Sequence, residues 1–276
     1  MSQTDIETEV KAPSLIGKKR PSSRKEIFQR IWPPIFSFIL LLIVWQVLVV
    51  GFEVPEYIMP PPSDFLARLV ESRSLLFDHM LRTATEVALG FLLATAISVP
   101  LGYLIASVNF VERSVYPLIV FVQLTPKIAI APLFIVWFGF GMTPKIFITF
   151  LLCFFPTLVA SMAGFKSLDE RILFLSRSMG ATPKQTFRYI QLPTAMPYIF
   201  AGLRVSIVFA ATGAIVGEFV GANKGLGYLL LRGSAYLDTA LIFAVLIVLA
   251  LMGLFFSYAV QFTEQIFMPW KRKGGK

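Results

Sequence analysis

The sequence predicts an all-α integral membrane protein with six transmembrane helices. Of its 276 residues, 56% are hydrophobic and only 15% are charged, whereas soluble domains are about 25% charged. Six apolar segments come close to the roughly 20 residues that a helix needs to cross the hydrocarbon core of a bilayer. Strands of a membrane barrel would be shorter and would alternate in polarity. Composition and segment length together therefore favour a helical bundle.

These segments define the order of the chain. Residues 1–33 form a polar tail, in which 24–31 are expected to be a short surface helix after a mobile stretch. Residues 34–79 hold the first span and an external loop, 80–265 hold a core of five spans, and 266–276 are a basic tail. The expected spans are Ile35–Phe52, Val87–Val108, Val115–Phe138, Ile146–Phe165, Pro197–Val220 and Ala240–Phe262.

Lys and Arg are distributed unequally between the two sides of these spans. The N-terminal tail, the 109–114 and 166–196 loops and the C-terminal tail hold seventeen of them, whereas the opposite side holds six. Because cytoplasmic loops carry an excess of Lys and Arg, both termini are expected to be cytoplasmic and the 53–86 loop external. This bias accounts for the net charge of +9; no nucleic-acid-binding motif accompanies it.

Small residues recur every four positions in two spans, which lets another helix approach closely. We favour tight packing within the bundle over a sliding interface between moving helices. The ladders are Gly90, Ala94, Ser98, Gly102 and Ala106 in the second span, and Gly202, Ser206, Ala210, Ala214, Gly213, Gly217 and Gly221 in the fifth.

Prolines interrupt the third span. Interior prolines remove a backbone hydrogen bond and kink a helix, and the freed backbone is tolerated at membrane depth where protein or a water-filled cavity surrounds it. Residues 123–132 are therefore a candidate wall of a pathway. Its candidate residues are Gln123, Thr125, Pro126 and Lys127.

Charged side chains inside the spans cost about 2.5–3.5 kcal/mol each and ordinarily face a cavity or a partner. Lys127 could attract an anionic or polar solute, or it could snorkel or pair with a carboxylate; the sequence leaves both open. Arg204 is expected to bind helix-end carbonyls near the cytoplasmic side, and Glu218 to shape an outer gate. Thr212, in the same span, completes the candidate pathway set.

The polar stretch at 166–196 is patterned as helix, turn and helix. Apolar residues at three- and four-residue spacing predict an amphipathic helix over Leu168–Met179, and Gly180 suits its end. A second helix is expected to follow and to stop at Leu192-Pro193, with Pro197 opening the next span. Its start is specified by Thr182 as N-cap, Pro183 as first residue and Gln185 as the capping-box partner.

This stretch resembles the cytoplasmic EAA loop of permease subunits in ATP-binding-cassette (ABC) importers. Gly180, Ile190 and Leu192-Pro193 have the motif's spacing, while Phe174-Leu175-Ser176 replaces Glu-Ala-Ala. The resemblance extends from about residue 80 to the C-terminus. Its other blocks are similar to the branch that imports nitrate, sulfonates, taurine and thiamine-precursor pyrimidines: TPKIAIAPLFIVWFGFG, FFPTLVASMAGF, LPTAMPYIFAGLRVS and VGEFVGANKGLGYLL.

The resemblance implies a type I importer (MetI-like) fold in the bacterial cytoplasmic (inner) membrane. Its expected partners are membrane lipid, a second permease copy, a cytoplasmic ATPase dimer that binds ATP and Mg, and a periplasmic or lipid-anchored solute-binding protein. No cofactor is expected in this chain. The resemblance of the VGEFVGANKGLGYLL block favours a heteroaromatic solute of the thiamine-precursor group. The residues implied to couple the permease to the ATPase are Ser176, Gly180, Ala181, Thr182, Pro183, Ile190, Leu192 and Pro193.

Catalytic chemistry has no support in the residues. There is no phosphate-binding loop and no credible set of nucleophile, base and acid, so we expect no enzyme. Cys153 is read as a small buried residue, and His79 as a structural residue in a polar loop. The alternative function is a secondary transporter or channel working without an ATPase, which predicts inverted repeats and discontinuous helices.

Overall fold

The computed structural model describes the backbone of residues 24–272 and the side chains of residues 32–270. The expected mobile stretch at the start of the N-terminal tail lies outside these residues. The chain divides into two units, residues 1–53 and residues 54–276, which we describe separately.

The first unit contains one helix, α1 (Arg24–Gly51). The surface helix and first span predicted separately are thus continuous, and the helix passes through Pro33 and Pro34. Its apolar side chains are largely exposed within the unit, as in a helix whose surroundings are lipid or other protein.

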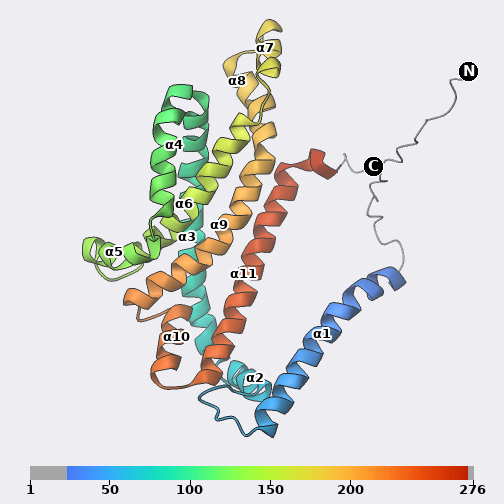
Figure 1. Cartoon of the computed structure of the whole chain (residues 1–276), viewed down its shortest axis with the longest axis vertical. Coiled ribbons are helices and arrows are strands. Elements are labelled where there is room, and N and C mark those ends of the chain that lie inside the picture. Colours follow the sequence, from blue (N-terminus) through green and yellow to red (C-terminus); the bar gives the residue numbers. More distant parts are fainter. Residues whose placement is uncertain (1–23, 273–276) are drawn as a thin grey trace, which may run out of the picture. The chain divides into compact units, whose positions relative to one another are not determined.

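The second unit is entirely helical over its described residues (Figure 1). Long helices run side by side, with α7 and α8 at one end and α2 and α10 at the other. Its elements are α2 (Pro62–Glu71), α3 (Arg73–Ser107), α4 (Asn109–Leu124), η1 (Lys127–Ile130), α5 (Ala131–Phe138), α6 (Thr143–Lys166), α7 (Glu170–Ser178), α8 (Pro183–Thr186), η2 (Phe187–Gln191), α9 (Leu192–Gly221), α10 (Leu226–Ala235), α11 (Thr239–Phe267) and η3 (Pro269–Arg272).

Five described helices are long and apolar enough to cross a membrane, and a sixth span results when α4 and η1–α5 are counted together. The pair bends by 79°, so the third predicted span is not one straight helix. The break falls at Thr125-Pro126, where the proline has no N–H to continue the helix.

Several predicted boundaries are wrong. The predicted 109–114 loop is the start of α4. The 53–86 loop contains α2 and the first turns of α3, because the amphipathic start of α3 packs its apolar side chains, such as Leu76, into the core. At a third boundary, Leu192-Pro193 does not end a helix. The π-helical turn η2 joins α8 to α9, and the N–H of Leu192 donates to the carbonyl of Phe187 five residues earlier. Pro193 then falls in the first turn of α9, directly after the π-helical turn.

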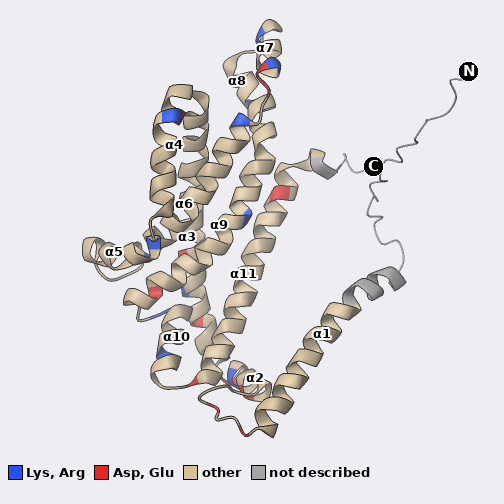
Figure 2. Ribbon diagram, viewed as in Figure 1, with Lys and Arg blue, Asp and Glu red and all other residues tan. Residues whose placement is uncertain are grey.

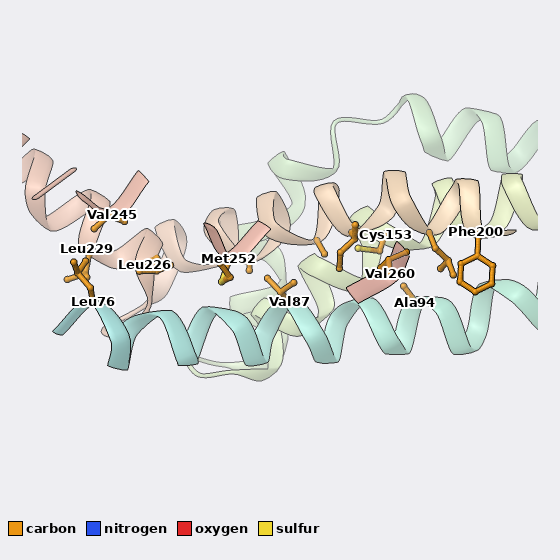
Figure 3. Close-up of a cluster of buried hydrophobic side chains, with 14 of the residues drawn as sticks. Leu76, Val87, Ala94, Cys153, Phe200, Leu226, Leu229, Val245, Met252 and Val260 are labelled. Atoms are coloured by element: carbon orange, nitrogen blue, oxygen red, sulfur yellow. The ribbon is translucent and has the colours of Figure 1, made fainter. Parts of the chain in front are cut away.

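The core lies where α6 packs against α3 on one side and α9 on the other. Figure 3 shows its buried side chains extending along the helices, from Leu76 and Leu229 at one end to Phe200 at the other. Cys153 is fully buried among them and its thiol donates to the carbonyl of Ser206, which confirms its prediction as a buried residue.

The small-residue ladders lie in these contacts. A Cβ atom added at Gly213 would come within 2.7 Å of the Thr149 backbone, and one added at Gly102 within 2.7 Å of the Ser161 side chain. Both distances are shorter than real Cβ contacts, so the glycines are needed for the helices to approach this closely. Tight packing within the bundle is therefore what the structure assigns to these residues.

Candidate functional site

The 166–196 loop begins with α7, which is closed at both ends by its own residues. The Asp169 side chain accepts a hydrogen bond from the N–H of Arg171 at 2.9 Å, which starts the helix two residues later than predicted. At the other end Gly180 has φ +79°, a conformation that favours glycine. The N–H groups of Gly180 and Ala181 donate to the carbonyls of Arg177 and Ser176. These two bonds form a Schellman motif, so the predicted helix end is confirmed.

The second helix of the loop starts as the sequence predicts. The N–H of Gln185 donates to Thr182 Oγ1 at 3.3 Å, and the N–H of Thr182 donates to Gln185 Oε1 at 2.8 Å. This reciprocal pair is a capping box, with Pro183 in the first turn. The hydroxyl of Ser176 lies 3.4 Å from that of Thr186, and both residues are buried, so α7 and α8 are tied to each other.

The outer surface of this loop is unusually apolar for a polar stretch. The structure leaves the side chains of Phe174, Leu175 and Met179 strongly exposed, Met179 at 79%. Ile190, Leu192 and Pro193 lie half-buried at the base of the loop. Because apolar side chains gather at a tip that is itself held rigidly by caps, the tip has the character of a docking surface for another protein.

The bent segment places the predicted pathway residues of the third span on the bundle surface. Lys127 Nζ donates to the carbonyl of Gln123 at 2.8 Å and lies 5.0 Å from the centre of the Phe155 ring. Gln123 and Pro126 are exposed and Thr125 is half-buried. The lysine thus caps the end of α4 while its ammonium stays near the surface.

The predicted residues of α9 do not converge on the bent segment. Arg204 forms an ion pair with Glu264 of α11 instead of the helix-end carbonyls expected for it. It lines a cavity of about 330 Å³ with Ser257 and Tyr258. Thr212 is exposed and its hydroxyl bonds to a carbonyl of its own helix. Figure 2 shows charged residues scattered along the helices of the bundle.

Glu218 is fully buried and holds the turn between α9 and α10. Its Oε1 accepts a hydrogen bond from Thr83 Oγ1 at 2.7 Å, and its Oε2 accepts one from the N–H of Gly227 at 2.5 Å. Gly225, at φ +124°, leaves the room that the carboxylate occupies, because an added Cβ would collide with it. Glu218 therefore has a structural role in this turn.

The sequence analysis did not predict the buried polar residues that surround this turn. Lys145, counted as a residue of an outer loop, is buried in α6 and donates to Glu86 Oε1 of α3 at 3.0 Å. His79, predicted in a polar loop, is in α3, where its Nδ1 lies 3.0 Å from the nitrogen of Gly225. The sequence did contain one signal: Glu86 stands directly before the apolar run that begins at Val87. Acidic residues are rare in membrane spans and ordinarily have a partner or a function there.

Five to six candidate spans define the class as a multi-pass helical membrane protein, and the chain also carries a capped, apolar-tipped loop. A family profile described as "Binding-protein-dependent transport system inner membrane component" matches residues 98–273. The chain belongs to this family, and it is a multi-pass inner-membrane permease subunit of a binding-protein-dependent ABC importer.

Individual relatives cover nearly the whole chain. It is 36% identical over 250 residues to the formylaminopyrimidine transport permease protein ThiX of Halalkalibacterium halodurans, covering 90% of this chain and 99% of ThiX. It is 37% identical to the riboflavin transport system permease protein RibX of Chloroflexus aurantiacus, covering 91% and 96%. The taurine transport system permease protein TauC of Escherichia coli is 25% identical, covering 93% and 97%.

A solved structure supports the fold. A chain of the MetNI methionine ABC transporter, in an inward-facing conformation, superposes with a TM-score of 0.60 at 20% identity, covering 72% of this chain and 97% of that one. The MetI-like fold expected from the EAA-like loop is thereby confirmed. The family also decides between the two functions considered from sequence: this is an importer subunit of the ABC class, and ATP hydrolysis belongs to another component.

Proposed function

We propose that the 166–196 loop is the coupling loop of this permease and seats in a groove of a cytoplasmic ATPase dimer. The observation that carries the proposal is the exposed apolar tip formed by Phe174, Leu175 and Met179 on a loop fixed by a Schellman motif and a capping box. A rigid element shared by two discrete states is what energetic coupling between distant sites requires. This placement, with the excess of Lys and Arg on the same side, puts both termini in the cytoplasm.

Two copies of the chain enclose the transport path in this proposal. Gln123 and Lys127 lie at the surface of the bend between α4 and α5, and Arg204 and Thr212 lie on another part of the bundle. Polar residues at membrane depth ordinarily face a cavity or protein. A second copy packed against the bend would convert this surface into the wall of an enclosed path.

The solute is a small heteroaromatic compound of the pyrimidine or flavin type. Identity to the formylaminopyrimidine and riboflavin permeases is 36% and 37%, against 28% for an aliphatic sulfonate permease and 25% for the taurine permease. An external binding protein delivers the solute, so the permease path needs only to pass it.

The test is uptake into proteoliposomes that contain the permease, its ATPase and its binding protein. We expect ATP-dependent uptake of labelled formylaminopyrimidine or riboflavin, with taurine and nitrate as comparison solutes. Uptake of taurine or nitrate alone would refute the heteroaromatic assignment. Uptake at full rate without the ATPase would refute the coupling role of the loop.

Lys127→Ala tests the path itself. Loss of the ammonium from the path wall is expected to lower the uptake rate by about tenfold, equivalent to roughly 1.4 kcal/mol, while assembly with the ATPase is retained. Lys127→Arg keeps the positive charge and serves as the matched control. Unchanged uptake in the alanine variant would remove Lys127 from the path.

A further inference from the structure

Two buried carboxyl groups lie close together at the α10 end of the bundle. Glu86 of α3 and Glu218 of α9 are both fully buried. Their side chains lie within hydrogen-bonding reach of each other. Two ionised carboxylates at such a distance repel, and each would also lose its hydration. The surrounding groups decide whether this pair can be fully ionised.

The positive charges near the pair are concentrated on one oxygen atom. Lys145 Nζ of α6 lies 3.0 Å from Glu86 Oε1, and Arg82 Nε of α3 lies 3.4 Å from the same atom. Lys145 is buried, whereas the Arg82 side chain is 39% exposed, so its charge is partly neutralised by solvent. Glu86 Oε1 is therefore well compensated as an anion.

The remaining oxygens of the pair have only neutral donors or none. Glu218 accepts from the hydroxyl of Thr83 and from the N–H of Gly227, both uncharged. Glu86 Oε2 is buried and accepts no hydrogen bond from any donor among the described side chains and backbone. A buried acceptor without a donor is unfavourable, so Glu86 Oε2 is the atom at which a hydrogen bond is needed.

The other titratable group packed against the site does not supply that hydrogen bond. The ring of His79 of α3 stacks on Tyr228 of α10, with centroids 5.9 Å apart, and its Nδ1 contacts the backbone of Gly225. Lys145 from α6 and Arg82 from α3 are already engaged by Glu86 Oε1. The carboxyl of Glu218 lies within hydrogen-bonding reach of Glu86, so a proton between the two carboxyl groups would supply the missing hydrogen bond.

We propose that Glu86 and Glu218 form an internal proton-binding site, in which one proton is held between the two carboxyl groups. The proton lies between Glu86 Oε2 and the carboxyl of Glu218, so that one hydrogen bond replaces one repulsion. The pair keeps one negative charge, which Lys145 beside Glu86 Oε1 neutralises. This shared proton joins α3, α6 and α9 at the turn that leads into α10, and its loss would separate them.

The experiment is infrared spectroscopy of the full-length permease, purified in a detergent without ester groups, at neutral pH. Labelling with ¹³C-glutamate identifies the carbonyl stretch of a protonated glutamic acid and separates it from aspartic acid. We expect one such band in the native protein, lost in both Glu86→Gln and Glu218→Gln. In each variant the remaining carboxyl can ionise beside Lys145, because its repelling neighbour is gone.

Glu264→Gln is the matched control, because Glu264 is another buried carboxyl and pairs with Arg204; its substitution should leave the band in place. Absence of the band from the native protein would overturn the proposal, and this measurement needs no variant to fold. A band that survives both substitutions, or that is lost in only one, would also overturn it, because the proton would then belong to another residue or to one carboxyl alone.

Discussion

The two ends of the bundle place polar and apolar groups in opposite ways. At the α10 end, Glu86, Lys145 and Glu218 are buried, and Lys145 pairs with Glu86 inside the protein. At the α7 end, Leu175 and Met179 are exposed while the polar caps hold the backbone. The charged groups at the first end pair within the chain, whereas the apolar side chains at the second end need another protein to cover them. Substitutions at the two ends should therefore fail differently, one in folding and the other in assembly.

The largest effect is expected from Lys145→Met. Removing the buried cation leaves the negative charge at Glu86 with only the partly exposed Arg82 beside it, which costs about 3–5 kcal/mol of folding free energy. The measurement is the midpoint of thermal or denaturant unfolding in detergent. Lys166→Met is the control, since Lys166 pairs with Glu112 at a more exposed site, where an ion pair contributes about 0–1 kcal/mol. Equal effects of the two substitutions would contradict the contrast between the ends.

A smaller loss of stability, with a clear loss of coupling, is expected from Gly180→Glu. A non-glycine residue in this left-handed conformation costs about 1–2 kcal/mol, and the space around Gly180 is open, so the backbone alone is affected. We expect the permease to insert but ATP hydrolysis stimulated by the binding protein to disappear. Gly180→Asn is the control, because asparagine tolerates this conformation. Normal stimulation in the glutamate variant would show that the loop geometry is dispensable.

The smallest effect on the fold is expected from Met179→Ser. The side chain is 79% exposed, so stability should change by no more than about 0.5 kcal/mol. Affinity for the ATPase, measured by co-purification or titration, should fall by about tenfold, which equals roughly 1.4 kcal/mol of lost contact. Tyr236→Ser alters an equally exposed residue, at 78%, next to α10 and should leave that affinity unchanged. If both substitutions weaken the complex alike, the apolar tip is not the docking surface.

The same contrast separates what the sequence could predict from what it could not. Gly180, Thr182 and Gln185 act on backbone groups within a few residues, so their roles follow from local spacing. Glu86 and Lys145 are 59 residues apart, and Thr83 and Glu218 are 135 apart, so their pairing depends on how α3, α6 and α9 pack. The first turns of α3, before Val87, were not predicted for the same reason. Their sequence is polar, and their helical structure depends on packing against the rest of the bundle.

The junction at η2 has a mechanical consequence. Because the π-helical turn continues the helix past Pro193, residues Pro183–Gly221 form one helix of 39 residues, roughly 58 Å long at about 1.5 Å per residue. This helix begins in the capped loop, and Glu218 lies near its other end. A displacement of the loop at Thr182 would therefore be passed along this continuous helix towards the turn at Gly225.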